Sequence, residues 1–438
     1  MIIVDLAFIS TNMALKKISS LLPPTISCLI FIICSGFLSN IYAQDNNKLS
    51  KANTLYKAKR YAEAIPIYEE ILEDDLNKSV LIKLARSHRI INNSKEALIH
   101  YTTLIAQPEP KAEHQLEYIE LLIINGDYTE AKRYLREIES TNTNIEQILN
   151  LTSMINNNFE IDSMYQQVQL ESFIYNTPLT DENSPYLIEG KIIYTSDSSP
   201  YDKLKNKSGW TGRAFYKVWE SELKNGVYST PQMFSKAVNA TNKNTANVVF
   251  DWENNEVFFT KNDNAKDRKD FYNMQLYSSP IRNGKFGKAQ KLSVNNKEYN
   301  YMHPCISKDG KTLLYVSDRS GEGGTDIYIA KRTSNGWSRG KNLGGVINTK
   351  ENEGFPFLDV EGNLYFCSKG HSGLGGYDIF YAAKEEDGSW SSPKNLGRPF
   401  NSQHDDISIF LKSNGIEGAF TSSRNGSDDI FLFTIGEQ

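Results

Sequence analysis

The chain has 438 residues, which is too long for one ordinary domain and fits two folded units preceded by a targeting segment. Its 48 basic and 53 acidic residues nearly balance, so no basic field is present to attract nucleic acid or an anionic membrane surface. After about residue 165, aromatic residues and glycine become frequent and the apolar period shortens from helical to alternating. We therefore expect an α+β multidomain chain that is helical first and all-β afterwards.

Residues 1–43 have the features of a secretory signal peptide. Lys16 and Lys17 form a positive region, an apolar run over residues 26–38 follows, and Ala43 is a small residue suited to cleavage. The apolar run is shorter than the about 20 residues that span a bilayer, so we expect a cleaved signal and not a retained anchor. The mature chain is then exported to the periplasm, at the periphery of the outer membrane.

Two alternatives concern this segment. Met13 competes with Met1 as the start of translation, because the residues between them add no positive charge to the signal. Cys34 suggests a lipoprotein, but a lipidated cysteine requires a small residue directly before it, and Ile33 is bulky. We therefore expect no lipid anchor.

Two cysteines remain after cleavage, Cys305 and Cys367. They fall at non-equivalent places in the β repeats described below, and two cysteines do not define a disulfide framework even in an oxidising compartment. We expect two separate buried thiols.

A repeat of 33 to 34 residues runs through the region 48–157, with copies that begin at Arg60, Asn93 and Asp127. Each copy carries an alanine followed by an aromatic residue three or four positions later. This pattern resembles three tetratricopeptide repeats, in which small residues let paired helices approach and aromatic residues fill the space between hairpins. A further helix over 144–157 would cap the stack. The predicted packing residues are Ala64, Tyr68, Ala97, Tyr101, Ala131 and Tyr134.

A second repeat of about 52 residues fills the region 164–438. Its clearest copies contain a strand, a Gly-Gly-x-Asp-Ile-aromatic segment and a tryptophan turn. Four short strands in about fifty residues form a propeller blade, because each small sheet must bury both faces against its neighbours. Two degenerate copies upstream and a partial copy at the end give five blades, with six as the alternative. The blade-motif residues are Asp318, Asp326, Trp337, Asp378, Trp390 and Asp429.

The last copy lacks its final strand. The alternating segment 168–174, just before the first blade, can supply that strand and close the ring. We therefore expect the two ends of the propeller to pair with each other.

The blade motifs resemble WD40-like blades of the TolB type, in which a strand ending in Ser-Asp-Arg precedes Gly-Gly-x-Asp-Ile-Tyr, as at 317–319 and 323–328. The complete order is similar to the N-terminal part of envelope proteins that continue into a carboxypeptidase-regulatory-like module and an OmpA-like peptidoglycan-binding domain. That group is associated with type IX secretion and gliding, which implies outer-membrane or secretion-complex proteins as partners. The sequence stops at the propeller, so peptidoglycan anchoring is not carried over.

No catalytic residue, cofactor or metal site is predicted. Calcium at the turns of Asp326 and Asp378 is an alternative, but an aspartate at a strand start commonly accepts turn amides. His303, His371 and His404 do not have the spacing of a zinc site, although His303 and His404 fall near equivalent blade junctions and could approach the central channel. We expect a chain that is not an enzyme.

The leading functional hypothesis is a non-catalytic scaffold in which the helical groove and the propeller bind other envelope proteins. A rigid spacer is the alternative role for the helices. The alternative for the whole chain is a carbohydrate- or peptidoglycan-binding module, or a propeller lyase or hydrolase, with Trp210, Trp219 and Tyr301 lining a sugar pocket. The other role for these three aromatic residues is packing between blades.

Overall fold

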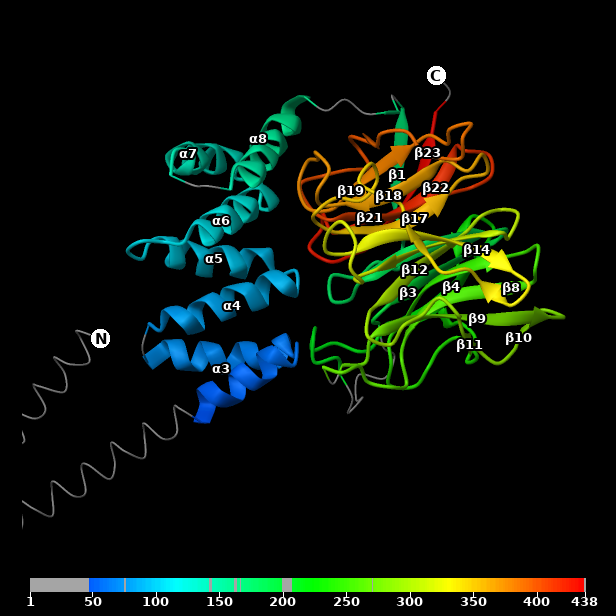
Figure 1. Cartoon of the computed structure of the whole chain (residues 1–438), viewed down its shortest axis with the longest axis horizontal. Coiled ribbons are helices and arrows are strands. Elements are labelled where there is room, and N and C mark those ends of the chain that lie inside the picture. Colours follow the sequence, from blue (N-terminus) through cyan, green and yellow to red (C-terminus); the bar gives the residue numbers. More distant parts are fainter. Residues whose placement is uncertain are drawn as a thin grey trace, which may run out of the picture.

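The structure is a computed structural model that describes residues 47–74, 76–141, 144–160, 164–165, 167–198, 207–269 and 271–436. Within these residues, a stack of helices is followed by a five-bladed β-propeller (Figure 1). The predicted α+β organisation and the number of blades are therefore confirmed. The predicted signal peptide, with Cys34 and Met13, lies outside the described residues.

Seven helices form the stack in the described part of the chain, and short turns join them into antiparallel hairpins. A residue with positive φ recurs in the turn inside each hairpin, at Lys59 (56°), Asn92 (64°) and Gly126 (82°). The helices are 47–57, α3 (Tyr61–Asp74), α4 (Lys78–Ile90), α5 (Ser94–Ile105), α6 (Ala112–Ile124), α7 (Tyr128–Ile138) and α8 (Ile145–Glu160).

The predicted packing residues occupy the inside of this stack. Ala64, Ala97 and Ala131 are fully buried, as are Tyr68 and Tyr101. Where the alanines lie, neighbouring helices can approach closely, and the tyrosines fill the spaces beside them. Tyr134 is only partly buried and meets Tyr118 edge to face, with ring centroids 5.2 Å apart. Helix α8 covers the end of the stack through Ile148, Leu151, Met154 and Ile155.

Each blade is a small antiparallel sheet whose first strand faces the central channel. Blade 1 contains β2 (Glu182–Ile188), β3 (Lys191–Ser196), β4 (Lys217–Lys224), β5 (Val227–Tyr228) and β6 (Gln232–Met233). Blade 2 contains β7 (Thr245–Asp251), β8 (Glu256–Asn262), β9 (Met274–Arg282), β10 (Lys285–Phe286) and β11 (Gln290–Lys291). Blade 3 contains β12 (Tyr301–Ile306), β13 (Thr312–Ser317), β14 (Asp326–Thr333), β15 (Gly336–Trp337) and β16 (Lys341–Asn342).

Blades 4 and 5 complete the ring. Blade 4 contains β17 (Glu353–Leu358), β18 (Leu364–Ser368), β19 (Asp378–Ala382) and β20 (Lys394–Asn395), and blade 5 contains β21 (Asp406–Leu411), β22 (Glu417–Ser422), β23 (Asp429–Ile435) and β1 (Val168–Ser172). Strand β1 pairs antiparallel with β23, from Val168 opposite Ile435 to Ser172 opposite Phe431. The predicted closure of the ring by the segment before the first blade is confirmed.

A hydrophobic cluster fills each boundary between neighbouring blades, which we call a seam. The seam between blades 3 and 4, for example, buries Leu314 and Ile327 of blade 3 against Phe366 and Phe380 of blade 4. Cys305 belongs to the same cluster, and Cys367 is also buried and free. The prediction of two separate buried thiols is confirmed.

The stack of helices lies along one side of the propeller (Figure 1). At its N-terminal end, Tyr61 meets Trp210 of blade 1 edge to face, with ring centroids 5.1 Å apart. The backbone N–H of Ala62 donates to the carbonyl oxygen of Trp210 at 3.3 Å. The ammonium of Lys59 lies 5.2 Å from the ring centroid of Phe271 in blade 2.

The C-terminal end of the stack is fixed to blade 4. The Asn157 side-chain amide donates to the hydroxyl of Ser372 (2.9 Å) and to the carbonyl oxygen of Gly373 (3.1 Å), and Lys350 pairs with Glu146 at 2.6 Å. The propeller residues in these contacts lie before first strands or between second and third strands. The turns between first and second strands therefore lie at the opposite end of the blades, away from the helices.

Candidate functional site

The aspartates of the blade motif cap turns within the propeller. Asp326 accepts the N–H groups of Glu322 (2.7 Å) and Gly323 (3.3 Å), and Asp378 accepts those of Leu374 (2.8 Å) and Gly375 (3.2 Å). A side chain at Gly373 would collide with this carboxylate, because its Cβ would lie 2.1 Å from the Asp378 Oδ2. The repeated glycines and aspartates therefore form self-contained turns.

The two remaining aspartates of the motif also make local hydrogen bonds. Asp429 accepts the side-chain amide of Asn425 at 2.8 Å. Asp318 is exposed and accepts the backbone N–H (2.7 Å) and the side-chain amide (2.6 Å) of Asn300, which precedes β12. Among the described residues, no three His, Cys, Asp or Glu side chains are grouped so that they could hold a metal ion.

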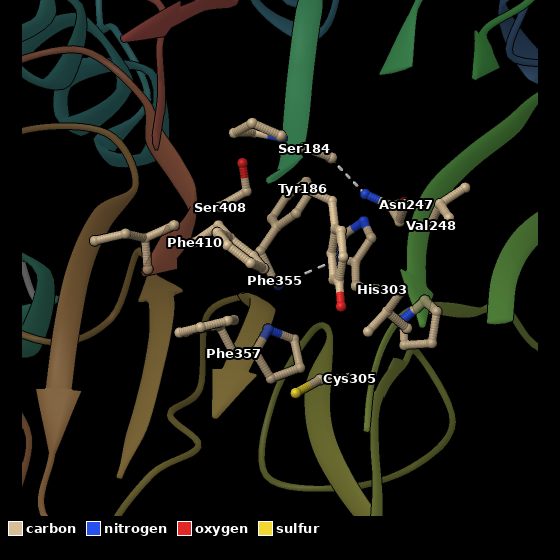
Figure 2. Close-up of a pocket in the computed structure, with 15 residues that line it drawn as sticks. Ser184, Tyr186, Asn247, Val248, His303, Cys305, Phe355, Phe357, Ser408 and Phe410 are labelled. Atoms are coloured by element: carbon tan, nitrogen blue, oxygen red, sulfur yellow. Dashed lines mark hydrogen bonds between the residues drawn. The ribbon is translucent and has the colours of Figure 1, made fainter. Parts of the chain in front are cut away.

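The central channel is lined by an irregularity that every first strand carries at the same level (Figure 2). In each blade the pairing register shifts there, and a residue other than glycine takes a positive φ between 37° and 54°. These bulges turn five side chains toward one another, those of Ser184, Asn247, His303, Phe355 and Ser408.

His303 is the titratable side chain in this ring. Its ring stacks on Phe355 with centroids 3.7 Å apart, and its Nδ1 accepts the backbone N–H of Phe355 at 3.3 Å. The Nε2 therefore carries the proton of the neutral ring. Burial lowers the pKa of His303 to about 3. The channel volume is about 70 Å³, which holds a few water molecules and is far below the roughly 300 Å³ of a small ligand pocket.

A larger opening lies at the seam between blades 3 and 4, at the end of the blades away from the helices. This opening, which we call the seam cleft, has a volume of about 710 Å³. The turn between β12 and β13 borders it with Lys308 and Asp309, and the turn between β17 and β18 borders it with Asp359 and Glu361. Its size is that of a pocket for an extended small ligand.

Trp390 forms part of the wall of the seam cleft. Its indole N–H donates to the carbonyl oxygen of Gly362 at 3.1 Å, which fixes the ring against the turn of its own blade. The ammonium of Lys384 lies 3.8 Å from the ring centroid. The motif tryptophan of blade 4 is therefore half-buried and borders an open space.

The equivalent seam between blades 2 and 3 is closed. There Trp337 is only 8% exposed, and the Arg332 guanidinium lies 4.5 Å from its ring centroid. Arg332 forms ion pairs with Asp251 and Glu256 of blade 2 and donates to the carbonyl oxygen of Gly310 at 2.7 Å. We call Arg332, Asp251 and Glu256 the seam clamp.

A cluster of buried carboxylates lies where blade 1 meets blade 5. The Arg213 guanidinium pairs with both Asp181 and Asp197, and its Nε lies 2.6 Å from the Asp197 Oδ2. Burial raises the pKa of Asp197 to about 6 in spite of this arginine. Burial also raises the pKa of Asp428 well above its ordinary value, with the nearby Asp181 as the next cause.

The aromatic residues proposed for a sugar pocket do not come together. Trp219 and Tyr301 are buried in blade packing, at 8% and 3% exposure, and Trp210 contacts the helices. Blade packing is therefore the role of Trp219 and Tyr301. The blade motif predicts a structural role for Trp390 and does not indicate that this residue borders a cleft.

Of the three histidines considered, only His303 lines the channel. His371 is packed beside Phe366 and Phe380, and its Nε2 lies 2.8 Å from the carbonyl oxygen of Ile347. The expectation that His404 approaches the channel is wrong, because its position before β21 places it at the helix-facing end of the blade.

No helix among the described residues is long and apolar enough to cross a membrane.

No family model matches the sequence, and none of the curated proteins matches it. The solved structures that resemble the chain include a thermostable family-43 glycoside hydrolase, with 16% identity, TM-score 0.37, and coverage of 60% of this chain and 91% of that one.

Two further solved structures resemble the same part of the chain. The α-L-arabinofuranosidase of Podospora anserina has 10% identity, TM-score 0.35, and coverage of 59% of this chain and 91% of its own. An oligogalacturonate lyase has 14% identity, TM-score 0.30, and coverage of 57% and 63% respectively. The strand pairing shows that the second unit is a β-propeller, while the resemblance to tetratricopeptide repeats and TolB-type blades stays a prediction.

One sequence-based prediction needs correction. The chain was expected not to be an enzyme, whereas these solved structures that share its propeller fold are described as two glycosidases and a lyase. At 10 to 16% identity and TM-scores of 0.30 to 0.37, these structures transfer no substrate and no residue role to this chain.

Proposed function

We propose that this protein is a carbohydrate-binding propeller and that the seam cleft is its binding site. The observation that carries the proposal is the cleft itself, with a volume of about 710 Å³ and a wall that contains Trp390. Sugar rings combine apolar C–H faces with a rim of hydroxyl groups. A tryptophan flanked by polar side chains matches both features.

The polar groups for sugar hydroxyls come from two blades. Ser307 and Lys308 belong to the turn of blade 3, and Glu361 belongs to the turn of blade 4. Lys384 covers one face of the Trp390 ring and is itself exposed. Its flexible stem lets the ammonium leave the ring at a cost of about 0.5–1 kcal/mol, which opens the indole to a sugar.

Replacing Trp390 tests this proposal. We expect Trp390→Ala to weaken oligosaccharide binding about tenfold or more, since stacking and burial on an aromatic ring contribute about 1–3 kcal/mol. Isothermal titration calorimetry with a panel of oligosaccharides, including peptidoglycan fragments, measures the effect. Trp252→Ala is the matched control, because Trp252 is an exposed tryptophan of blade 2 that does not border the cleft. A wild-type protein that binds no member of the panel would overturn the proposal.

A second candidate function is the capture of partner proteins by the helices, as in an envelope scaffold of the outer membrane or a secretion complex. The observation in its favour is a pair of apolar residues on the outside of the capping helix. Ile145 and Leu149 are one turn apart on α8 and are 67% and 63% exposed. Exposed apolar side chains on one helix face are typical of contact surfaces.

A crosslinked pulldown from the native envelope tests this second candidate. The double variant Ile145→Glu and Leu149→Glu should lose the proteins that the wild type retains, while thermal unfolding stays unchanged. Retention of the same proteins by both would exclude this face of α8. Fractionation of the same cells tests the proposed export, since recovery of the chain in the cytoplasm would contradict it.

A further inference from the structure

The seam clamp between blades 2 and 3 is not repeated between blades 3 and 4, because a different residue stands at each of its three positions there. In blade 3, Arg332 lies six positions after Asp326, and in blade 4 the position six after Asp378 is Lys384. Strand pairing aligns β8 with β13, so that Thr312 takes the place of Glu256. Ser307 takes the place of Asp251 at the end of the first strand.

The replacement removes two carboxylates and leaves the positive charge. Arg332 reaches across its seam to the carboxylates of blade 2, whereas the ammonium of Lys384 donates to the carbonyl oxygen of Gly388 and lies over Trp390, both in its own blade. A lysine without a carboxylate across the seam cannot close it as the clamp does. The seam between blades 3 and 4 therefore lacks the clamp at the end where the cleft opens, and Lys384 remains there with Lys331 in a lining of four lysines and four carboxylates.

A second lysine lies on the opposite wall. Lys331 of β14 donates to the Thr312 hydroxyl at 2.8 Å, and its charge acts on Lys384. Burial is the first cause that lowers the pKa of Lys384, and the positive charge of Lys331 is the second. Within the described part of the chain, neither ammonium forms an ion pair with a carboxylate. Asp387 acts on Lys384 and Asp309 on Lys331 without forming an ion pair, and an anion between the two ammonium groups would be attracted by both.

Within the described residues, the two aspartates that border the cleft form no ion pair with Lys331 or Lys384. Asp309 accepts the Ser307 hydroxyl (2.6 Å) and the backbone N–H of Lys311 (3.1 Å). Asp359 accepts the backbone N–H of Asn363 (2.8 Å) and its side-chain amide (2.8 Å). Both aspartates thus hold their own turns.

Two glutamates at the cleft are exposed and remain available as acceptors. Glu253 and Glu361 border the opening from the turns of blades 2 and 4. A carboxylate accepts hydrogen bonds from sugar hydroxyls, as it does from other O–H donors. The cleft therefore offers cationic donors on its walls and anionic acceptors on its turns.

We propose that the seam cleft binds an acidic oligosaccharide, with a sugar carboxylate held between Lys331 and Lys384 and the ring beside it placed against Trp390. This inference rests on the proposed carbohydrate-binding function and specifies the class of ligand. The sugar carboxylate occupies the place that the side chains of Asp251 and Glu256 fill in the neighbouring seam. The ligand closes this seam as the clamp closes the other.

The test compares an acidic tetrasaccharide that contains glucuronate with the same tetrasaccharide after its carboxyl groups have been reduced to alcohols. Titration calorimetry of the purified full chain should give about tenfold or tighter binding for the acidic form, because its carboxylates accept charge-assisted hydrogen bonds that the reduced form does not make. Lys384→Gln should bring the acidic form to the affinity of the reduced form. Lys394→Gln is the control, because it makes the same change on an exposed lysine of blade 4 outside the cleft.

A clamp transplant provides the second variant. Ser307→Asp, Thr312→Glu and Lys384→Arg together rebuild the seam clamp in this seam, so we expect loss of acidic-sugar binding with equal or higher thermal stability. Equal affinity for both tetrasaccharides, with no effect of Lys384→Gln, would overturn the acidic class and leave the carbohydrate proposal intact. Failure of both to bind would overturn both proposals. If inorganic sulfate bound as tightly as the acidic tetrasaccharide, the cleft would be a general anion site. That result would overturn the proposal of a sugar ligand.

Discussion

At the scale of single residues, the same amino acid behaves differently according to what surrounds it. Asp318 and Asp197 both follow the second strand of a blade, and both accept the backbone N–H that precedes the first strand. Asp318 is exposed, whereas the Asp197 side chain is fully buried beside Arg213. Burial therefore sets the protonation behaviour of Asp197, with consequences for stability at different pH values.

The raised pKa of Asp197 predicts a pH-dependent stability difference. Because burial raises its pKa from the ordinary value to about 6, the folded state favours the protonated acid. The contribution of protonated Asp197 to the stability of the folded state is full below about pH 4, and it is lost as the pH rises toward about 6. We expect the melting temperature of Asp197→Asn, relative to wild type, to rise across this range and level off above it.

Thermal melts between pH 3.5 and 8 measure this difference. Asp318→Asn makes the equivalent change at an exposed position and is the matched control. If Asp197→Asn runs parallel to wild type, burial does not control the titration of Asp197.

At the scale of elements, the sequence predicts the blade repeat. It does not predict how the copies of the repeat differ. Trp337 and Trp390 follow identical patterns of strand, turn and strand, so the motif predicts the same structural role for both. Their exposure depends on residues of the preceding blade, namely Asp251 and Glu256 in one case and Ser307 and Thr312 in the other. Those residues lie outside the quoted motif. Aligning the first two strands of every blade would have revealed this difference between the preceding blades.

The seam clamp predicts unequal effects of equal substitutions. Arg332→Met leaves Asp251 buried without its guanidinium, and we expect the free energy of unfolding to fall by about 2–3 kcal/mol, because breaking a largely buried pair strands a charge. Lys384→Met, at the same place in the next blade, should cost less than about 1 kcal/mol, since it removes no ion pair. Urea unfolding measures both. Similar losses for the two variants would contradict the role of the clamp.

The helical repeats were predicted from their alanines and tyrosines; of these residues Tyr134 is only partly buried, and the others are fully buried. What the sequence did not reveal was that the turns of these hairpins face the propeller. The relevant residues, such as Lys59 and Tyr61, have no special pattern, and their partners lie in loops between β strands that vary from blade to blade. Contacts between units depend on how two surfaces fit, which a repeat period does not encode.

At the scale of the whole molecule, the helices and the seam cleft lie at opposite ends of the blades. The stack is fixed to blade 1 through Trp210 and to blade 4 through Asn157. The cleft opens among the turns between first and second strands. The two proposed sites, for a partner on the helices and for a glycan in the cleft, therefore lie on separate surfaces.

The attachment of the helices predicts a local effect of changing Trp210. Trp210→Ala removes the ring contact with Tyr61, so we expect faster amide hydrogen exchange in α3 and in the turn before it, with unchanged exchange in blades 3 to 5. Hydrogen-exchange mass spectrometry measures both regions. Trp252→Ala, which changes an exposed tryptophan away from the helices, is the control. Unchanged exchange in α3 would show that Trp210 does not hold the stack.

The pairing of β1 with β23 has a consequence for the order of synthesis. The ribosome makes β1 first among the propeller strands and its partner β23 last, with 256 residues, 173–428, between them. At a rate of about 5–20 residues per second, β1 waits tens of seconds with an unpaired edge, and such edges recruit other chains. The helices that precede it are complete long before then, so the nascent chain carries a finished solenoid beside an open ring.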